Sequence, residues 1–187
     1  MPFPTTYAQF FLAMTIRQLS APEARQHLPS LVDLLVDSVN NGSSVGFLLP
    51  LAPAEAADYW QGVVEAIETQ QRVLLVAEED GQLLGTVQLD PVHKTNAPHR
   101  AEVCKLLVHS RHRRLGLGRQ LLQAVEAAAR ELHRTTLVLD TRLGDVSEQL
   151  YQSQGYARAG EIPEFVRNEK GELQATVVYY KLLSAQP

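Results

Sequence analysis

Residues 108–122 read Val-His-Ser-Arg-His-Arg-Arg-Leu-Gly-Leu-Gly-Arg-Gln-Leu-Leu, and this stretch decides the fold. An apolar strand pattern ends at Val108, a turn with Gly116 and Gly118 follows, and a strongly helical segment begins there. A helix N-terminus binds anions well, because its first N–H groups have no partner within the helix and the helix dipole adds positive potential. Glycines let the backbone approach a phosphate closely, and the arginines around the turn add charge. The stretch therefore predicts a site for the di- or polyphosphate group of a cofactor.

Two common phosphate-binding motifs do not fit this turn. A P-loop needs a lysine directly after its second glycine, but Arg119 follows Gly118. The dinucleotide fingerprint needs glycine or alanine three residues after the second glycine, where Leu121 stands. The residues match the pattern Arg-x-x-Gly-x-Gly over 113–118 instead. The alternative interpretation is a basic helix start preceded by an ordinary glycine turn.

Composition restricts the class of protein. The chain has 187 residues, of which 45% are hydrophobic, which suits one globular domain with a substantial core. A net charge of −4 argues against a general nucleic-acid binder, so we expect no nucleic-acid partner. Cys104 is the single cysteine and lies in an apolar strand pattern; we expect it to pack in the core of a cytoplasmic protein. His109 and His112 lack cysteine or carboxylate partners in their basic loop, so we expect no metal site.

The N-terminal segment carries a short apolar patch at Phe10–Ala13, before the first strand pattern begins. The patch is too short to span a membrane and lacks the basic residues of a signal peptide. We therefore expect a flexible extension over residues 1–14, or a true start at Met14, and no membrane partner. Residues 15–187 are expected to form a single domain.

The hydrophobic periodicity predicts an α/β protein with a mixed sheet. The Asp80-Gly81 pair predicts a hairpin between two of the strands. Helices are expected from Ala21 to about Asn40, at 54–70, from the glycine turn to Leu132, and at 146–154. Strands are expected at 15–19, 72–78, 82–89, 101–108, 135–140, 156–160 and 176–181.

A second signature lies near the end of the chain, where Tyr151-Gln152-Ser153-Gln154-Gly155-Tyr156 has the form Tyr-x-x-x-Gly-Tyr. Together with residues 113–118 and the order of elements, it resembles the GNAT superfamily of N-acetyltransferases over roughly Thr15 to Leu183. The resemblance implies the GNAT fold, a mixed, mostly antiparallel, twisted sheet of about six to seven strands flanked by about four helices. It also implies acetyl-CoA as the donor substrate.

The resemblance assigns three catalytic roles. It implies that Tyr151 hydrogen-bonds the coenzyme A sulfur and protonates the departing thiolate. Glu102 matches the position where several members place a general base. Residues 85–89, 100–106 and 139–141 also look like the tabtoxin resistance group, which implies that Asp140 is a second base. The alternatives are a buried packing role for Tyr151, an exposed strand-entrance charge for Glu102 and a turn cap for Asp140.

The resemblance also indicates which residues bind the cofactor. The expected strand at 101–108 resembles the central strand of this superfamily. In the superfamily this strand splays from its parallel neighbour, and its backbone then pairs with the pantetheine arm. A backbone N–H there, at Leu107, would polarise the thioester carbonyl. Gly144 stands where many members have asparagine, and Ser147 where alanine is common. The expected cofactor-binding residues are Leu106, Leu107, Val108, Arg113, Arg114, Leu115, Gly116, Leu117, Gly118, Arg119 and Ser147.

The sequence thus predicts an acetyl-CoA-dependent acetyltransferase that modifies an amine or hydroxyl of a small molecule by direct attack in a ternary complex. Acetylation of protein lysines or N-termini and a non-catalytic acetyl-CoA sensor are the alternatives. Homodimers are common in the superfamily, so a homodimer is a further expectation. Residues 44–47 and the Tyr59-Trp60 pair either wall the acceptor pocket or belong to the core.

Overall fold

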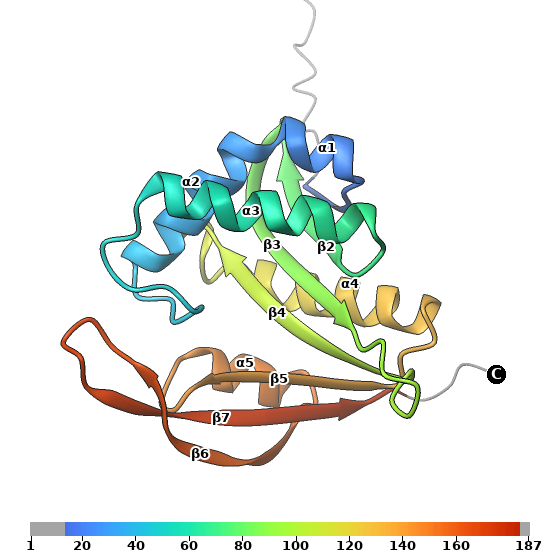
Figure 1. Cartoon of the computed structure of the whole chain (residues 1–187), viewed down its shortest axis with the longest axis vertical. Helices are drawn as coiled ribbons and strands as arrows, with labels where there is room; N and C mark the ends of the chain where they lie inside the picture. The colour runs from blue at the N-terminus through green and yellow to red at the C-terminus, as the bar shows by residue number, and fades with distance from the viewer. Residues whose placement is uncertain (1–13, 184–187) are drawn as a thin grey trace, which may run out of the picture.

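The computed structural model describes residues 14–183, which form one seven-stranded sheet with helices on both faces (Figure 1). The strands lie in the order β1-β2-β3-β4-β5-β7-β6, and only β4 and β5 pair in parallel. The predicted mixed, mostly antiparallel sheet is therefore confirmed. The predicted N-terminal extension lies outside the described residues, except for Met14. The strands are β1 Thr15–Gln18, β2 Val73–Glu79, β3 Gln82–Pro91, β4 Arg100–Val108, β5 Thr136–Arg142, β6 Ala157–Arg167 and β7 Leu173–Leu182.

Within residues 14–183, five α-helices cover the two faces of the sheet. The helices α1 (Ala21–Gln26), α2 (Leu28–Asn40) and α3 (Pro53–Glu68) pack on one face, where Trp60 is fully buried. On the other face lie α4 (Leu117–Glu131) and α5 (Ser147–Ser153) (Figure 1). Leu74 and Val76 of β2 point into the first core, and Leu75 and Ala77 into the second. This alternation gives the sheet two separate cores, one on each face.

The first predicted helix is broken in two. The pattern predicts one helix from Ala21 to about Asn40, but the chain leaves the helical path at His27, which ends α1 and precedes α2. Pro29 lies in the first turn of α2. Proline has no N–H to donate, and its ring clashes with the carbonyl four residues earlier, so it cannot lie inside a helix without breaking it. This break gives five helices where about four were expected.

The sheet opens between β4 and β5. These strands pair only at their N-terminal ends, Arg100–Glu102 with Thr136–Val138, and then diverge (Figure 1). On its other side β4 stays paired with β3 through a β-bulge, in which Lys105 and Leu106 together oppose Val87. Lys105 adopts a φ of 50° at the bulge. The extra residue brings the consecutive side chains of Cys104 and Lys105 onto the α3 side of the sheet, where both face residues near Tyr59.

The last hairpin extends further than the sequence pattern predicts. The expected strands at 156–160 and 176–181 are Ala157–Arg167 and Leu173–Leu182 in the structure. Pairing of β6 with β7 is irregular between Ile162 and Val166, where Pro163 cannot donate a hydrogen bond and Glu164 has a φ of 55°. The hairpin therefore bends at this edge of the sheet.

Candidate functional site

A cleft of about 1110 Å³ opens where β4 and β5 diverge. Its walls come from the loop after α2, from β4 with the glycine turn and the start of α4, and from β5 with α5. The bent part of β6 adds Phe165 and Val166. The predicted site residues that line it are Glu102, Leu106, Val108, Arg113, Arg114, Gly116, Leu117, Gly118, Arg119, Asp140, Ser147 and Tyr151.

One end of the cleft is formed by the glycine turn and the N-terminus of α4. Arg114 and Gly116 have φ angles of 64° and 83°, which turn the chain sharply after the 3-10 turn Ser110–His112. Gly116 is the N-cap of α4, and no side chain caps this helix. The N–H groups of its first turn have no partner within the helix and lie at the cleft wall, an arrangement that suits an anion. The Arg114 and Arg119 side chains border the same region.

Arg113 is held by the protein itself. Its guanidinium donates to the carbonyl oxygens of Val108 and Asn41, at 3.2 Å each, and to Ser43 Oγ at 3.3 Å. These contacts join the glycine turn to the loop after α2. Arg113 therefore shapes the turn, in addition to the positive charge that the sequence pattern indicates.

Asp37 of α2 makes a second connection to the same region. Its carboxylate accepts hydrogen bonds from the Ser110 N–H at 2.7 Å and from Ser110 Oγ at 2.8 Å. Burial favours the neutral acid, but the Ser110 hydrogen bonds and the charges of His109 and Arg113 together lower the pKa of Asp37. The carboxylate is therefore ionised at neutral pH and fixes the start of the turn.

Two predicted cofactor-binding residues lie outside the cleft lining. The Leu115 side chain is 72% exposed at the outside of the turn. The Leu107 side chain is 1% exposed and packs into the core under α1–α3, because the bulge shifts the alternation of β4. Any contact that Leu107 makes with a ligand therefore comes from its backbone.

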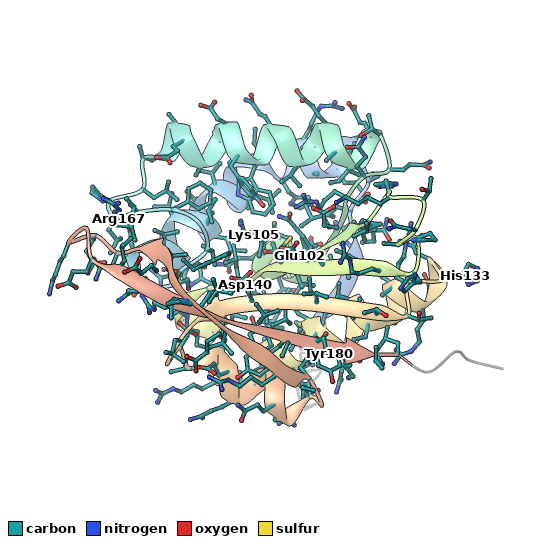
Figure 2. The ribbon with its side chains drawn as sticks, turned by 60° about the horizontal axis from the view of Figure 1, so that its bottom comes forward. Glu102, Lys105, His133, Asp140, Arg167 and Tyr180 are labelled. Atoms are coloured by element: carbon teal, nitrogen blue, oxygen red, sulfur yellow. The ribbon has the colours of Figure 1, made fainter. Side chains whose placement is uncertain are left out.

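Glu102 on β4 and Asp140 on β5 both line the cleft and lie near each other in the middle of the molecule (Figure 2). Desolvation by the cleft walls, then the charges of Asp140 and Asp90, raise the pKa of Glu102 above its ordinary value. Thr176 Oγ1 donates to Asp140 Oδ2 at 2.7 Å, which fixes that carboxylate. Two carboxylates near each other, one with a raised pKa, suit proton abstraction near neutral pH.

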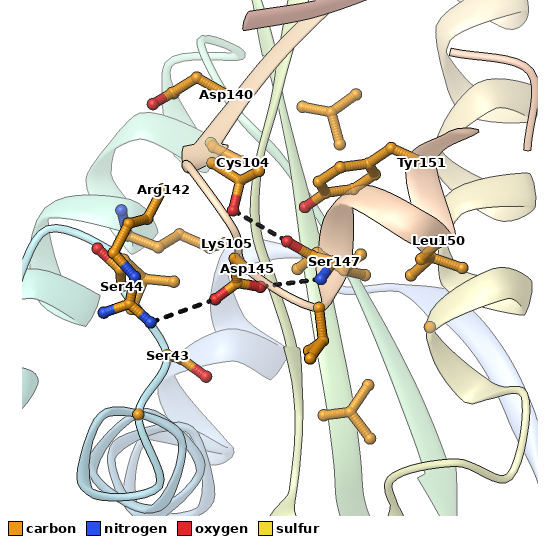
Figure 3. Close-up of a pocket in the computed structure, with 18 of the residues that line it drawn as sticks. Ser43, Ser44, Cys104, Lys105, Asp140, Arg142, Asp145, Ser147, Leu150 and Tyr151 are labelled. Carbon is orange, nitrogen blue, oxygen red and sulfur yellow. Dashed lines mark hydrogen bonds and ion pairs between the residues drawn. The ribbon is translucent and has the colours of Figure 1, made fainter. Parts of the chain in front are cut away.

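Tyr151 lies on α5 and points into the cleft (Figure 3). Burial raises its pKa to about 12, so the phenol stays protonated at neutral pH. One helical turn earlier, Ser147 Oγ lies 2.9 Å from Thr141 Oγ1, and the Ser147 N–H donates to Asp145 Oδ1 at 2.9 Å. Asp145 also lies 3.6 Å from the guanidinium of Arg142. These contacts fix the start of α5 and thus the orientation of Tyr151.

Cys104 lies on the wall of the cleft rather than deep in the core, and the structure leaves it partly buried. Burial raises the pKa of its thiol to about 11. Arg72 lies 3.5 Å from its Sγ and also bonds Gln88 Oε1 at 2.8 Å and Asp90 Oδ2 at 2.7 Å. A protonated thiol in this network is a poor nucleophile.

Sequence reasoning missed Lys105. Its side chain lines the cleft, and its Nζ lies 5.3 Å from the ring centroid of Tyr59 and 5.8 Å from that of Phe47. Burial lowers the pKa of Lys105. The available signal was a charged residue inside the apolar run from Val103 to Val108, because lysine is rarely buried without a partner.

Residues 44–47 and the Tyr59-Trp60 pair were expected either to wall the acceptor pocket or to belong to the core, and the structure places some in each. Residues 44–46 line the cleft, whereas Trp60 is fully buried in the core. Tyr59 packs edge-on against both Phe47 and Trp60, with centroids 5.4 Å and 5.3 Å apart. Tyr59 and Phe47 therefore form a layer between the core and Lys105.

Residues 39–156, which include the glycine turn and Tyr151, match the family model described as the acetyltransferase (GNAT) family. The chain belongs to this family. It is 35% identical over 117 residues to an uncharacterised N-acetyltransferase of the hisH–hisA intergenic region of Azospirillum brasilense, covering 62% of this chain and 68% of that protein. The predicted enzyme class, an N-acetyltransferase of this family, is thereby confirmed.

Solved structures agree on the fold. Ribosomal-protein-alanine N-acetyltransferase of Brucella melitensis has a TM-score of 0.77 and 24% identity, over 90% of this chain and 99% of that one. The structure of yncA from Salmonella typhimurium, solved with its cofactor acetyl-CoA, has a TM-score of 0.75 and 19% identity, over 94% of this chain and 96% of that one. At such identities these structures support the fold alone.

Two further features concern partners. Within residues 14–183, no group of three or more histidine, cysteine, aspartate or glutamate side chains could hold a metal ion. No helix in the described part of the chain is long and apolar enough to cross a membrane.

Proposed function

We propose that this chain transfers the acetyl group of acetyl-CoA to an amine or hydroxyl of a small molecule in a ternary complex. The observation that carries the proposal is that one cleft joins an uncapped helix N-terminus, a pair of carboxylates and the phenol of Tyr151. The acetyl-CoA in the yncA structure, which has the same fold, supports this donor. Two carboxylates attract an ammonium group, so an amine is the favoured acceptor.

The donor would lie along the cleft. Its pyrophosphate fits the first turn of α4, with the charges of Arg114 and Arg119 beside it. Beyond Glu102, β4 has no pairing with β5, so its edge at Leu106 and Val108 faces the cleft. A pantetheine arm carries two amides, which suit pairing with such an edge.

The chemistry is then a direct displacement. Glu102 or Asp140 takes a proton from the acceptor's ammonium group, and the free amine nitrogen attacks the thioester carbonyl carbon. Backbone N–H groups around Leu107 stabilise the oxyanion that forms. The C–S bond breaks as the carbonyl reforms, and Tyr151 donates its proton to the sulfur. The attacking nitrogen loses its second proton to solvent, from which Tyr151 is protonated again, so the products are coenzyme A and the neutral acetylated amine.

The test is release of free coenzyme A from acetyl-CoA with a panel of small amines and alcohols. We expect turnover by the wild type, and a fall in kcat of about 100-fold or more in Tyr151→Phe and in Glu102→Gln, with acetyl-CoA affinity unchanged. Asp140→Asn separates the two candidate bases. Glu131→Gln, an exposed charge at the end of α4, is the matched control and should keep full turnover.

Two results would contradict the proposal. Binding of acetyl-CoA without turnover of any acceptor would indicate a sensor rather than an enzyme. Full turnover in both the Tyr151→Phe and Glu102→Gln variants would remove the roles assigned to these side chains.

A further inference from the structure

Lys105 has an unusual environment for a lysine. Its side chain rises from the β4 bulge into the cleft, and its Nζ is 3.9 Å from where a Cβ on Gly46 would lie. Aromatic rings of Tyr59 and Phe47 lie on its other side, at 5.3 Å and 5.8 Å. Within residues 14–183, no carboxylate comes within ion-pair distance of this ammonium group.

Two neighbouring arginines are already paired with carboxylates. Arg72 is bound to Asp90 at 2.7 Å, and Arg142 lies 3.6 Å from Asp145. Cation–π contact offsets part of the desolvation of Lys105, but it does not replace a counter-ion. The cleft wall therefore keeps a positive charge with unused hydrogen-bonding capacity, which is a costly arrangement unless an anion arrives.

Two carboxylates lie near Lys105. Glu102 and Asp140 lie with Lys105 in the middle of the molecule, at the opening between β4 and β5 (Figure 2). The anion site of α4 lies at another part of the cleft, beside the glycine turn. Lys105 is thus on the acceptor side, and the local charge distribution is that of a binding site for a zwitterion.

We propose that Lys105 binds a carboxylate of the acceptor, so that the acceptor is a compact amino acid whose ammonium group lies between Glu102 and Asp140. This proposal rests on the proposed function and narrows its acceptor class. Lys105 would determine specificity without taking part in the acetyl transfer, since the carboxylate it holds is not a group that reacts. Gly46 leaves room for that carboxylate, because its missing side chain would lie beside Nζ.

The test uses acceptors that differ only in the anionic group. The panel contains α-amino acids, their α-carboxamides and the corresponding decarboxylated amines, and unbranched amino acids with one to four methylenes between amine and carboxylate. Aminoalkyl phosphonates of the same lengths are included. Coenzyme A release gives kcat and KM for each acceptor and for acetyl-CoA, in the wild type, Lys105→Met and Lys105→Arg.

We expect the wild type to acetylate carboxylate acceptors with KM values about 10–100-fold below those of the matched amides, as one charged hydrogen bond provides. In Lys105→Met this preference disappears, with little change in kcat or in KM for acetyl-CoA, whereas Lys105→Arg keeps part of it. Lys94→Met, an exposed lysine outside the cleft, is the matched control and keeps the full preference. A thermal melt of each variant confirms that it is folded.

Several outcomes would overturn the inference. Equal use of acids and amides by the wild type, an unchanged preference in Lys105→Met, or preference for the phosphonates would each exclude the carboxylate site while leaving acetyl transfer intact. A uniform loss of kcat in Lys105→Met, with unchanged KM for acceptors, would assign the residue to chemistry instead. Absence of coenzyme A release with every acceptor would overturn the proposed function, and this inference with it.

Discussion

Gly85 lies on β3 opposite Val108, at the point where β4 passes the glycine turn. A Cβ built on Gly85 would lie 2.7 Å from the backbone oxygen of Leu107 and 3.0 Å from Leu121 Cδ1. The first contact is about 0.7 Å shorter than the 3.4 Å at which ordinary van der Waals contact begins. A backbone oxygen cannot rotate away, so Gly85→Ala must separate β3 from β4.

Overpacking of this kind costs about 1–3 kcal/mol, and we expect the upper half of that range because backbone has to move. For a chain of this size, about 2–3 kcal/mol lowers the melting temperature by about 4–12 °C. The displaced segment of β4 is also a wall of the cleft. The KM for acetyl-CoA should therefore rise in Gly85→Ala, measured by coenzyme A release.

Gly62 provides the matched control. It lies inside α3, and a Cβ there meets nothing within 4 Å. Gly62→Ala should stabilise the protein by about 0.5–1 kcal/mol, because alanine favours the helix over the unfolded chain. The same substitution thus has opposite signs at the two positions. Calorimetry in which both variants melt at or above the wild-type temperature would refute the packing argument for Gly85.

Three more predictions concern single side chains. Because the pKa of Glu102 is raised, the base form is lost as pH falls through a value above the ordinary 4.5, so kcat/KM should decline there, and Glu102→Gln should remove this limb of the pH profile. The Cys104 thiol, with a pKa raised to about 11, should react slowly with iodoacetamide at pH 7, and Cys104→Ala should keep turnover. Asp37→Asn should cost about 1–2 kcal/mol at pH 7 in urea unfolding. The pKa of Asp37 is lowered on folding, so its contribution is full above the unfolded pKa and lost as pH falls through the folded one; an equal cost at pH 7 and in strong acid would contradict this assignment.

Much of the fold is readable from local sequence. The continuous apolar run of β2 and the spacing of leucines in α4 identify these elements, because β2 has a core on each face of the sheet and α4 has one core to face. Pro29 is a sequence signal for the break at His27, but the leucine pattern continues on both sides of it and favours one unbroken helix. The length of β6 could not be predicted, because its residues are mostly exposed and carry no apolar alternation.

Some residues of the candidate site could likewise be predicted from local sequence, and others could not. The glycine turn and Tyr151 belong to short patterns of fixed spacing, so the sequence places them. The contacts of Arg113 and Asp37 join residues about 70 positions apart, and no local pattern reports such pairs. The β-bulge at Lys105 depends on pairing with β3, and a shift of one residue there changes which side chains face the cleft.

Arg113 holds the loop after α2 against the glycine turn, and Asp37 holds the last turns of α2 against the same region. Residues 44–46 of that loop line the cleft, with Gly46 beside Lys105. The loop after α2 therefore cannot be exchanged without an effect on the glycine turn. Grafting the acceptor loop of another acetyltransferase onto this chain would remove the Ser43 hydroxyl and could move the Asn41 carbonyl, both partners of Arg113, and donor affinity would fall together with the change in acceptor. Redesign of acceptor choice in this scaffold has to begin beyond Ser43, where the loop no longer supports the turn.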